Sequence, residues 1–257
     1  MQITNATLSE NTATITVGKT SSSMMNALRR TILNEVPILA IHTIDFRTQT
    51  SALYDEMLAH RIGLNPITTD YDTYDYEDVE DENARSAKSK VTMTLSLKGP
   101  GMVLGEHLKS KDPSVKSVYN KMPLVKLDED QELAFEAIAI MGKGKDHAKW
   151  SPGIASYYHE PIINVLNNSP EKSVRDKYPA SIFNGTKIDE SKIVGPEIID
   201  AIEGVDDSVI TIERKEDSYI FTAESFGMIS AKEMIARGAV ELTRMLEDFQ
   251  KEVKRAL

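Results

Sequence analysis

The C-terminal end of the chain carries a repeating apolar pattern that constrains the fold more than any other feature. Apolar residues recur there in steps of four, three, four, three and four, at Ile235, Ala239, Leu242, Leu246, Phe249 and Val253. This spacing predicts a helix over residues 230–256 with a heptad seam along one face. Ser230 and Glu233 have capping-box spacing, so the helix is expected to begin at Ser230. An apolar seam of this length must be buried against another surface, either within the same chain or on a partner.

The sequence leaves two alternatives for the surface that buries the seam. An apolar stripe most often lies on a sheet of its own chain, and the pattern alone favours that interpretation. However, Met234, Val240 and Met245 lie off the seam and widen the apolar surface. A helix that is apolar on more than one side needs two neighbours, so a second chain is the alternative cover.

A second amphipathic helix is predicted near the N-terminus, over residues 23–36. Pro37 disfavours helical geometry at the residue before it and so ends the helix. Arg29 and Arg30 are adjacent on this helix and point about 100° apart, so both meet one partner only if the helix lies flat on it. The apolar face has helical spacing and consists of Met25, Leu28, Ile32 and Val36.

Alternating or continuous apolar runs predict several strands and one hairpin. The hairpin is expected where residues 209–213 and 219–223 flank the polar run 214–218. Shorter helices are predicted over residues 52–67 and around 196–203. The other predicted strands are two within residues 2–17, then 38–46, 91–97 and 133–141.

Composition excludes several kinds of chemistry. The chain has no cysteine, which rules out disulfides, thiolate metal sites, iron–sulfur clusters and cysteine nucleophiles. The formal net charge of −10 argues against a nucleic-acid-binding protein, although a local basic patch remains possible. No signal peptide and no apolar run long enough for a membrane span are visible, so a cytoplasmic protein without membrane contact is expected.

The segment 70–82 is acidic at eight of its thirteen positions and has no basic residue. Self-repulsion predicts a solvated, mobile surface loop. A calcium loop of the EF-hand type is the alternative, but it requires glycine at its sixth position and glutamate at its twelfth. Asp75 and Asp81 occupy these positions, so the acidic surface loop is the favoured interpretation.

The run Gly142-Lys143-Gly144-Lys145-Asp146-His147-Ala148-Lys149-Trp150 is the stretch most typical of an enzyme. Lysines among glycines suggest a phosphate cradle, yet the run matches neither the P-loop nor the dinucleotide-binding pattern. A basic turn that ends in a buried tryptophan is the plainer alternative. His42 is expected to be a hydrogen-bonded core residue of its strand. No histidine pair has metal-ligand spacing and no nucleophile motif accompanies His147, so neither a catalytic nor a metal site is predicted.

Four segments together resemble the alpha-like assembly subunits of DNA-directed RNA polymerase, and most closely those of the archaeal D type. The eukaryotic third subunit and the bacterial alpha N-terminal domain belong to the same family. The segments cover most of the chain, and the first one and the run 145–152 are the most specific. They comprise residues 24–67, 98–105, 121–152 and 224–229.

The resemblance implies an α+β fold with a discontinuous alpha-like dimerisation domain, in which two helices lie on a small antiparallel sheet. That domain would span residues 1–46 and 205–257, with a mostly-β insert domain at 47–166 and a small third module at 167–204. Many archaeal relatives bind an iron–sulfur cluster in this module. The present chain lacks the cysteines for it, so no cofactor is expected and the module must hold by packing.

The implied function is a non-catalytic assembly platform of the polymerase. The chain would pair with the smaller alpha-like subunit L and recruit the small zinc-binding subunits N and P and the large catalytic subunits, without sequence-specific DNA binding. A homodimeric scaffold is the first alternative, and an enzyme that uses the 142–150 loop on a phosphorylated substrate is the second. The expected dimer interface comprises Met25, Leu28, Ile32, Ile235, Ala239, Leu242, Leu246, Phe249 and Val253. The expected contacts with the large subunits are Arg29, Arg30, Lys145, His147, Lys149 and Trp150.

Overall fold

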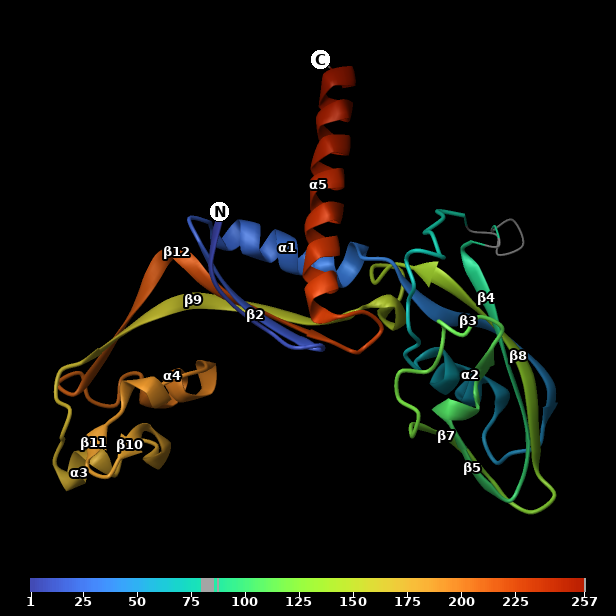
Figure 1. Cartoon of the computed structure of the whole chain (residues 1–257), viewed down its shortest axis with the longest axis horizontal. Coiled ribbons are helices and arrows are strands. Elements are labelled where there is room, and N and C mark those ends of the chain that lie inside the picture. The colour runs from blue at the N-terminus through green and yellow to red at the C-terminus, as the bar shows by residue number, and fades with distance from the viewer. Residues whose placement is uncertain (80–85, 87, 257) are drawn as a thin grey trace. The chain divides into compact units, whose positions relative to one another are not determined.

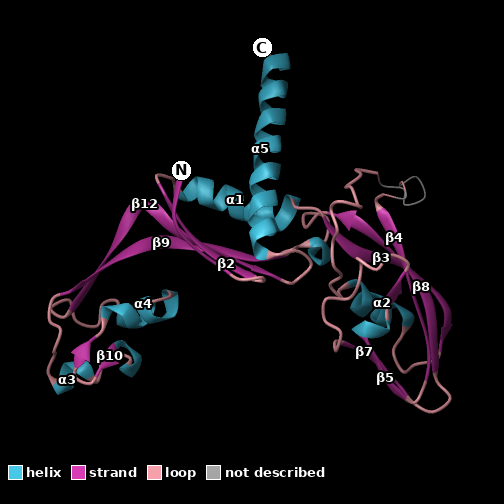
Figure 2. Cartoon of the chain, viewed as in Figure 1, coloured by secondary structure: helices cyan, strands magenta, loops and turns pink. Residues whose placement is uncertain are grey.

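The computed structural model describes residues 1–79, 86 and 88–256, and it has an α+β fold (Figure 1). The seam helix α5 is by far the longest helix in the described part of the chain (Figure 2). None of the described helices is both long and apolar enough to span a membrane. The helices are α1 (Ser22–Glu35), α2 (Asp55–Gly63), α3 (Lys172–Arg175), α4 (Pro196–Ile202) and α5 (Ala231–Ala256).

The strands of the described residues form two four-stranded sheets and two two-stranded sheets. The first large sheet has the order β1-β2-β12-β9 and consists of β1 (Gln2–Leu8), β2 (Thr12–Gly18), β12 (Ile210–Ser225) and β9 (Gly153–Val165). The second has the order β3-β8-β4-β6 and consists of β3 (Ile38–Gln49), β8 (Glu132–Gly142), β4 (Lys90–Lys98) and β6 (Lys109–Ser110). The small sheets pair β5 (Gly101–Leu104) with β7 (Pro123–Leu127) and β10 (Phe183–Asn184) with β11 (Lys187–Ile188).

The described chain consists of two compact units. The smaller unit comprises residues 1–4, 16–21 and 158–220, and the larger one comprises residues 5–15, 22–157 and 221–257. The larger unit contains α1, α2 and α5 together with the antiparallel sheet β3-β8-β4-β6. The three-part division expected from the sequence stays a prediction.

The predicted hairpin near the C-terminus is wrong. Residues 210–225 form one continuous strand, β12, and the polar run 214–218 lies within it. Glu160 on β9 accepts hydrogen bonds from the ammonium group of Lys215 at 2.8 Å and the hydroxyl of Ser218 at 2.6 Å. Glu160 is more than 50 residues away from Lys215 and Ser218 in the sequence. The polar run by itself therefore resembles a turn, because its hydrogen-bond partner cannot be seen locally. The helix predicted over residues 52–67 is also shorter, because α2 ends at Gly63.

A large apolar core lies between the sheet β3-β8-β4-β6 and α2 in the larger unit. The buried face of β8 alternates along the strand, with Leu133, Phe135 and Ala137 pointing into the core. Leu58 and Ile62 on α2 complete the core from the other side, one helical turn apart. The alternation predicted for β4 and the apolar run predicted for β8 are both confirmed.

The smaller unit has a separate core around α4 and the pair β10-β11. Tyr178, Ile182, Ile188, Ile193 and Ile202 are buried there, together with Val209 and Ile210. The Tyr178 hydroxyl donates to the backbone oxygen of Asp206 at 3.2 Å, which satisfies its polar end. Apolar side-chain packing therefore fills the interior of this unit.

Candidate partner-binding surfaces

The C-terminal half of α5 extends away from the rest of its unit (Figure 1). Its residues 244–256 are all exposed. Its seam side chains are uncovered: Leu246 is 55% exposed, Phe249 69% and Val253 38%. Val240 and Met245 are exposed beside them. Isolated exposed apolar residues are ordinary, but a contiguous stripe of this kind marks an interaction surface.

The N-terminal half of α5 packs on α1. Gly238 allows the close approach, because a Cβ atom there would overlap the side chain of Ile32. The hydroxyl of Ser230 caps α5 as predicted, accepting a hydrogen bond from the backbone N–H of Glu233 at 3.2 Å. Ile235 and Leu242 are half-buried at this crossing, whereas Ala239 is exposed.

The three α1 residues assigned to the dimer interface lie inside this chain. Met25, Leu28 and Ile32 are all buried, and Ile32 meets α5 at Gly238. Their apolar face is therefore used for packing within the larger unit. A partner contact for these residues stays a prediction, whereas Leu246, Phe249 and Val253 of the α5 seam are exposed.

The two arginines of α1 have different surroundings, as their angular separation predicts. The Arg29 guanidinium donates to the side-chain oxygen of Asn26 at 3.0 and 3.2 Å and is half-buried. Arg30 is exposed and lines a cavity of about 220 Å³ between α1 and α5, beside Leu242 and Met245. Arg30 is therefore the more exposed of the two arginines.

The glycines of the 142–150 loop are required by close packing. A Cβ atom on Gly142 would overlap the ring of Trp150, and one on Gly144 would overlap the backbone oxygen of Leu33. The Lys145 N–H also donates to the backbone oxygen of Asn34 at 3.1 Å, which ties the loop to the end of α1. Close backbone approach explains why glycine alternates with lysine here.

Lys143 is a structural residue rather than a surface cation. Its side chain is only 5% exposed, and its ammonium group lies 3.1 Å from a carboxylate oxygen of Glu35, which is itself 16% exposed. It also lies 4.7 Å from the ring centre of Tyr76. Lys145 reaches the same carboxylate at 3.6 Å but is 51% exposed. The Glu35 carboxylate thus joins α1 to the loop.

Trp150 is the buried residue on which the side chains of the 142–150 loop pack. It is buried, and its indole N–H donates to the backbone oxygen of Ile140 at 3.2 Å. The Lys149 ammonium lies 4.4 Å from the centre of this ring, and the ring of His147 meets it edge-on at 6.4 Å. The buried tryptophan expected from the sequence is confirmed, while its contact with a large subunit stays a prediction.

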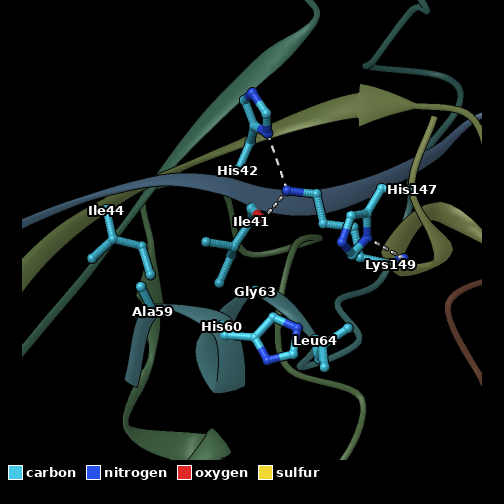
Figure 3. Close-up of a pocket in the computed structure, with 9 residues that line it drawn as sticks. All are labelled: Ile41, His42, Ile44, Ala59, His60, Gly63, Leu64, His147 and Lys149. Carbon is cyan, nitrogen blue, oxygen red and sulfur yellow. Dashed lines mark hydrogen bonds between the residues drawn. The ribbon is translucent and has the colours of Figure 1, made fainter. Parts of the chain in front are cut away.

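A pocket of about 240 Å³ lies between this loop, β3 and α2 (Figure 3). His42, His60 and His147 line it together with Lys149. The expectation that His42 lies in the core is wrong: the register of β3 against β8 shifts between Ile41 and Thr43, and His42 is exposed at this bulge. The sequence did not single out His60, because nothing local connects α2 with residues of the 142–150 loop.

The described part of the acidic segment, residues 70–79, is anchored by its tyrosines. The Tyr71 hydroxyl donates to the backbone oxygen of Pro37 at 2.7 Å, and the Arg237 guanidinium of α5 lies over the Tyr71 ring, 3.1 Å from its centre. The Tyr74 hydroxyl donates to the Asp112 carboxylate at 2.8 Å. No group of three His, Asp or Glu side chains able to hold a metal occurs within the described residues. Glu80, Asp81 and Glu82, which belong to the predicted mobile loop, lie outside them.

The α+β fold agrees with a match to a known family, and this match defines an alpha-like RNA polymerase subunit as the class of protein. Residues 41–154 match the family model described as the RNA polymerase Rpb3/RpoA insert domain, and this range includes α2, the strands β4, β6 and β8, all of β3 except its first three residues, and the 142–150 loop.

Similarity to curated proteins over most of their length identifies the family within this class. The chain is 35% identical to DNA-directed RNA polymerase subunit Rpo3 of Pyrococcus furiosus over 91% of this chain and 89% of that protein. It is 34% identical to subunit Rpo3 of Methanosarcina acetivorans over 93% of each chain. It is 30% identical to subunit Rpo3 of Halobacterium salinarum over 94% of this chain and 93% of that protein. The chain belongs to the Rpo3 family of DNA-directed RNA polymerase subunits.

Proposed function

We propose that the chain is the assembly platform of a DNA-directed RNA polymerase and pairs with a smaller alpha-like subunit through α5. The exposed seam at Leu246, Phe249 and Val253 is the observation that carries this proposal. Complete burial of such side chains contributes about 1.5–3 kcal/mol each, enough for a stable pair when several are covered together. Family membership supports a role inside the polymerase rather than a free enzyme.

The projecting half of α5 is stabilised as a helix before any partner covers it. Ion pairs at helical spacing join Arg244 to Glu241 at 2.9 Å, Lys251 to Asp248 at 2.9 Å and Arg255 to Glu252 at 2.6 Å. Each exposed pair of this kind contributes only about 0.3–0.5 kcal/mol, but together they favour a preformed helix. A preformed docking helix loses less conformational entropy on binding than a disordered segment would.

The mass of the isolated chain, measured with and without the smaller subunit, tests the pairing. We expect a monomer alone and a one-to-one complex after mixing. A stable homodimer of the isolated chain that does not exchange with the smaller subunit would contradict the proposal and support the homodimeric scaffold.

Contacts with the other subunits are proposed at Arg30, at the exposed loop residues Lys145 and His147, and at the half-buried Lys149. These groups offer cationic and donor atoms to acidic surfaces of the large subunits and of the small subunits N and P. The enzyme alternative is not favoured, because packing against Trp150 and Leu33 accounts for the two glycines that suggested a phosphate cradle.

Charge reversal at Arg30 tests the contact with the large subunits. We expect Arg30→Glu to leave the pairing with the smaller subunit intact and to reduce recruitment of the large subunits at least about tenfold. Arg29→Gln is the matched variant, because Arg29 is hydrogen-bonded to Asn26 on its own helix and its replacement should have a smaller effect. Co-purification of the large subunits measures both. Loss of the smaller subunit with Arg30→Glu would show that this side chain belongs to the pairing surface.

We propose further that the module 167–204 needs no metal or cofactor. The chain has no cysteine, and the isoleucine-rich core described above fills the smaller unit. Metal analysis of the purified chain tests this, and stoichiometric iron or zinc would contradict it.

A further inference from the structure

The pocket between β3, α2 and the 142–150 loop is lined by basic side chains and by apolar ones. Its polar lining groups are three imidazole rings and one amine, and no carboxylate is among its lining residues. Figure 3 shows Lys149 reaching into the centre, with His42 on one side and His60 on the other. Such an arrangement favours a ligand that only accepts hydrogen bonds and carries negative charge.

Two of these groups are oriented by their own hydrogen bonds. The Lys149 amine donates to the backbone oxygen of Ile41 at 3.0 Å and lies 3.0 Å from Nδ1 of His42. Nδ1 of His147 accepts the backbone N–H of Lys149 at 3.0 Å, so the neutral ring carries its proton on Nε2. An ammonium group has three donors, so Lys149 keeps one beyond these two contacts.

We propose that this pocket receives the carboxylate of an Asp or Glu side chain from a large polymerase subunit, an inference that rests on the proposed assembly function. The pocket is small and has Ile41, Ile44 and Leu64 around it, which suits a protein side chain with an apolar stem. A nucleic-acid backbone fits less well, because the net charge of −10 repels a polyanion. A single carboxylate needs only the few donor groups of the pocket itself.

The same groups make this contact sensitive to pH. Burial lowers the pKa of Lys149 to about 8, so the free pocket loses its positive charge as the pH rises through that value. A bound carboxylate favours the charged amine and raises its pKa, so binding takes up a proton above pH 8 and weakens as the pH rises further. His42 on β3, His60 on α2 and His147 on the loop are the other titratable groups that line the same pocket.

Zero-length crosslinking of the assembled polymerase tests the proposal. A carbodiimide activates a carboxyl group, the Lys149 amine displaces the resulting urea, and an amide bond joins the two chains. We expect a Lys149 amide to an Asp or Glu of a large subunit, together with at least about fivefold slower acetylation of Lys149 in the polymerase than in the free chain. Lys126, which is exposed on β7, serves as the reference amine and should react equally in both.

Equal acetylation of Lys149 in the free and assembled states, with no crosslink, would overturn the proposal. Protection that depends on added nucleic acid and gives no carboxylate crosslink would also overturn it, because a phosphate would then be the ligand. The pH profile provides a second readout: retention of the large subunits should fall from pH 7 to 9 with the native chain and stay level with Lys149→Arg. A pH-independent native complex would contradict the proposed role of Lys149.

Failure of this inference is distinguishable from failure of the proposed function. Lys149→Gln should keep the pair with the smaller subunit and lose about tenfold in retention of the large subunits, with Lys126→Gln as the unaffected control. If the chain does not pair through α5 at all, the assembly function fails. If pairing and recruitment both persist at native strength in Lys149→Gln, only the carboxylate pocket fails.

Discussion

Replacing both Leu246 and Phe249 with aspartate is expected to abolish pairing with the smaller subunit. Each side chain projects from the free half of α5, and its burial against a partner contributes about 1.5–3 kcal/mol. Losing both and burying two carboxylates instead should weaken the pair by more than about 100-fold. Co-purification of the smaller subunit and the mass of the mixture measure this effect.

The free energy of unfolding of the isolated double variant should change by less than about 0.5 kcal/mol, because both positions are exposed in the chain alone. Glu247→Ala combined with Lys251→Ala is the matched control on the opposite face of α5, and pairing should persist. A double aspartate variant that still recovers the smaller subunit at the native yield would show that the seam is not the interface.

Replacing Glu35 with glutamine is expected to lower the free energy of unfolding by about 3 kcal/mol. The change leaves the Lys143 ammonium buried without its carboxylate partner, and breaking a buried pair by removing one member costs in this range. Because Glu35 and Lys143 join α1 to the loop, the loss should be a loss of overall stability. Urea unfolding of the chain, followed by circular dichroism, measures it.

Lys145→Ala is the control for this prediction. Lys145 lies 3.6 Å from the same carboxylate but is 51% exposed, so its pair should contribute less than about 1 kcal/mol. Equal losses in the two variants would show that the carboxylate acts through its exposed neighbour. No loss in Glu35→Gln would show that a neutral hydrogen bond at 3.1 Å is sufficient to hold Lys143.

Local patterns in the sequence predicted most of the individual elements. The heptad spacing identified α5 with its Ser230 cap, and the helical spacing before Pro37 identified α1. Alternation identified β4, since each buried residue of that strand is followed by an exposed or half-buried one. These signals succeed because helix and strand periods are properties of neighbouring residues.

Features that depend on distant partners were not predictable in the same way. The charged run within β12 resembles a turn in the sequence, whereas in the fold Lys215 and Ser218 both donate hydrogen bonds to Glu160 on β9. His42 lies in an apolar run, but a bulge against β8 turns it outward. The contact between Arg237 and Tyr71 joins the seam helix to an acidic segment, and no local pattern relates the two.

The sequence by itself determined the α+β class, the two amphipathic helices, the absence of thiolate chemistry and the resemblance to polymerase assembly subunits. Only the tertiary structure decided which part of each apolar face is already used. Gly238 lets α5 approach Ile32, so the apolar face of α1 is covered internally and the seam stays open only beyond that crossing. The physical reason is that periodicity shows that a face must be buried, whereas the cover of that face depends on where distant segments meet.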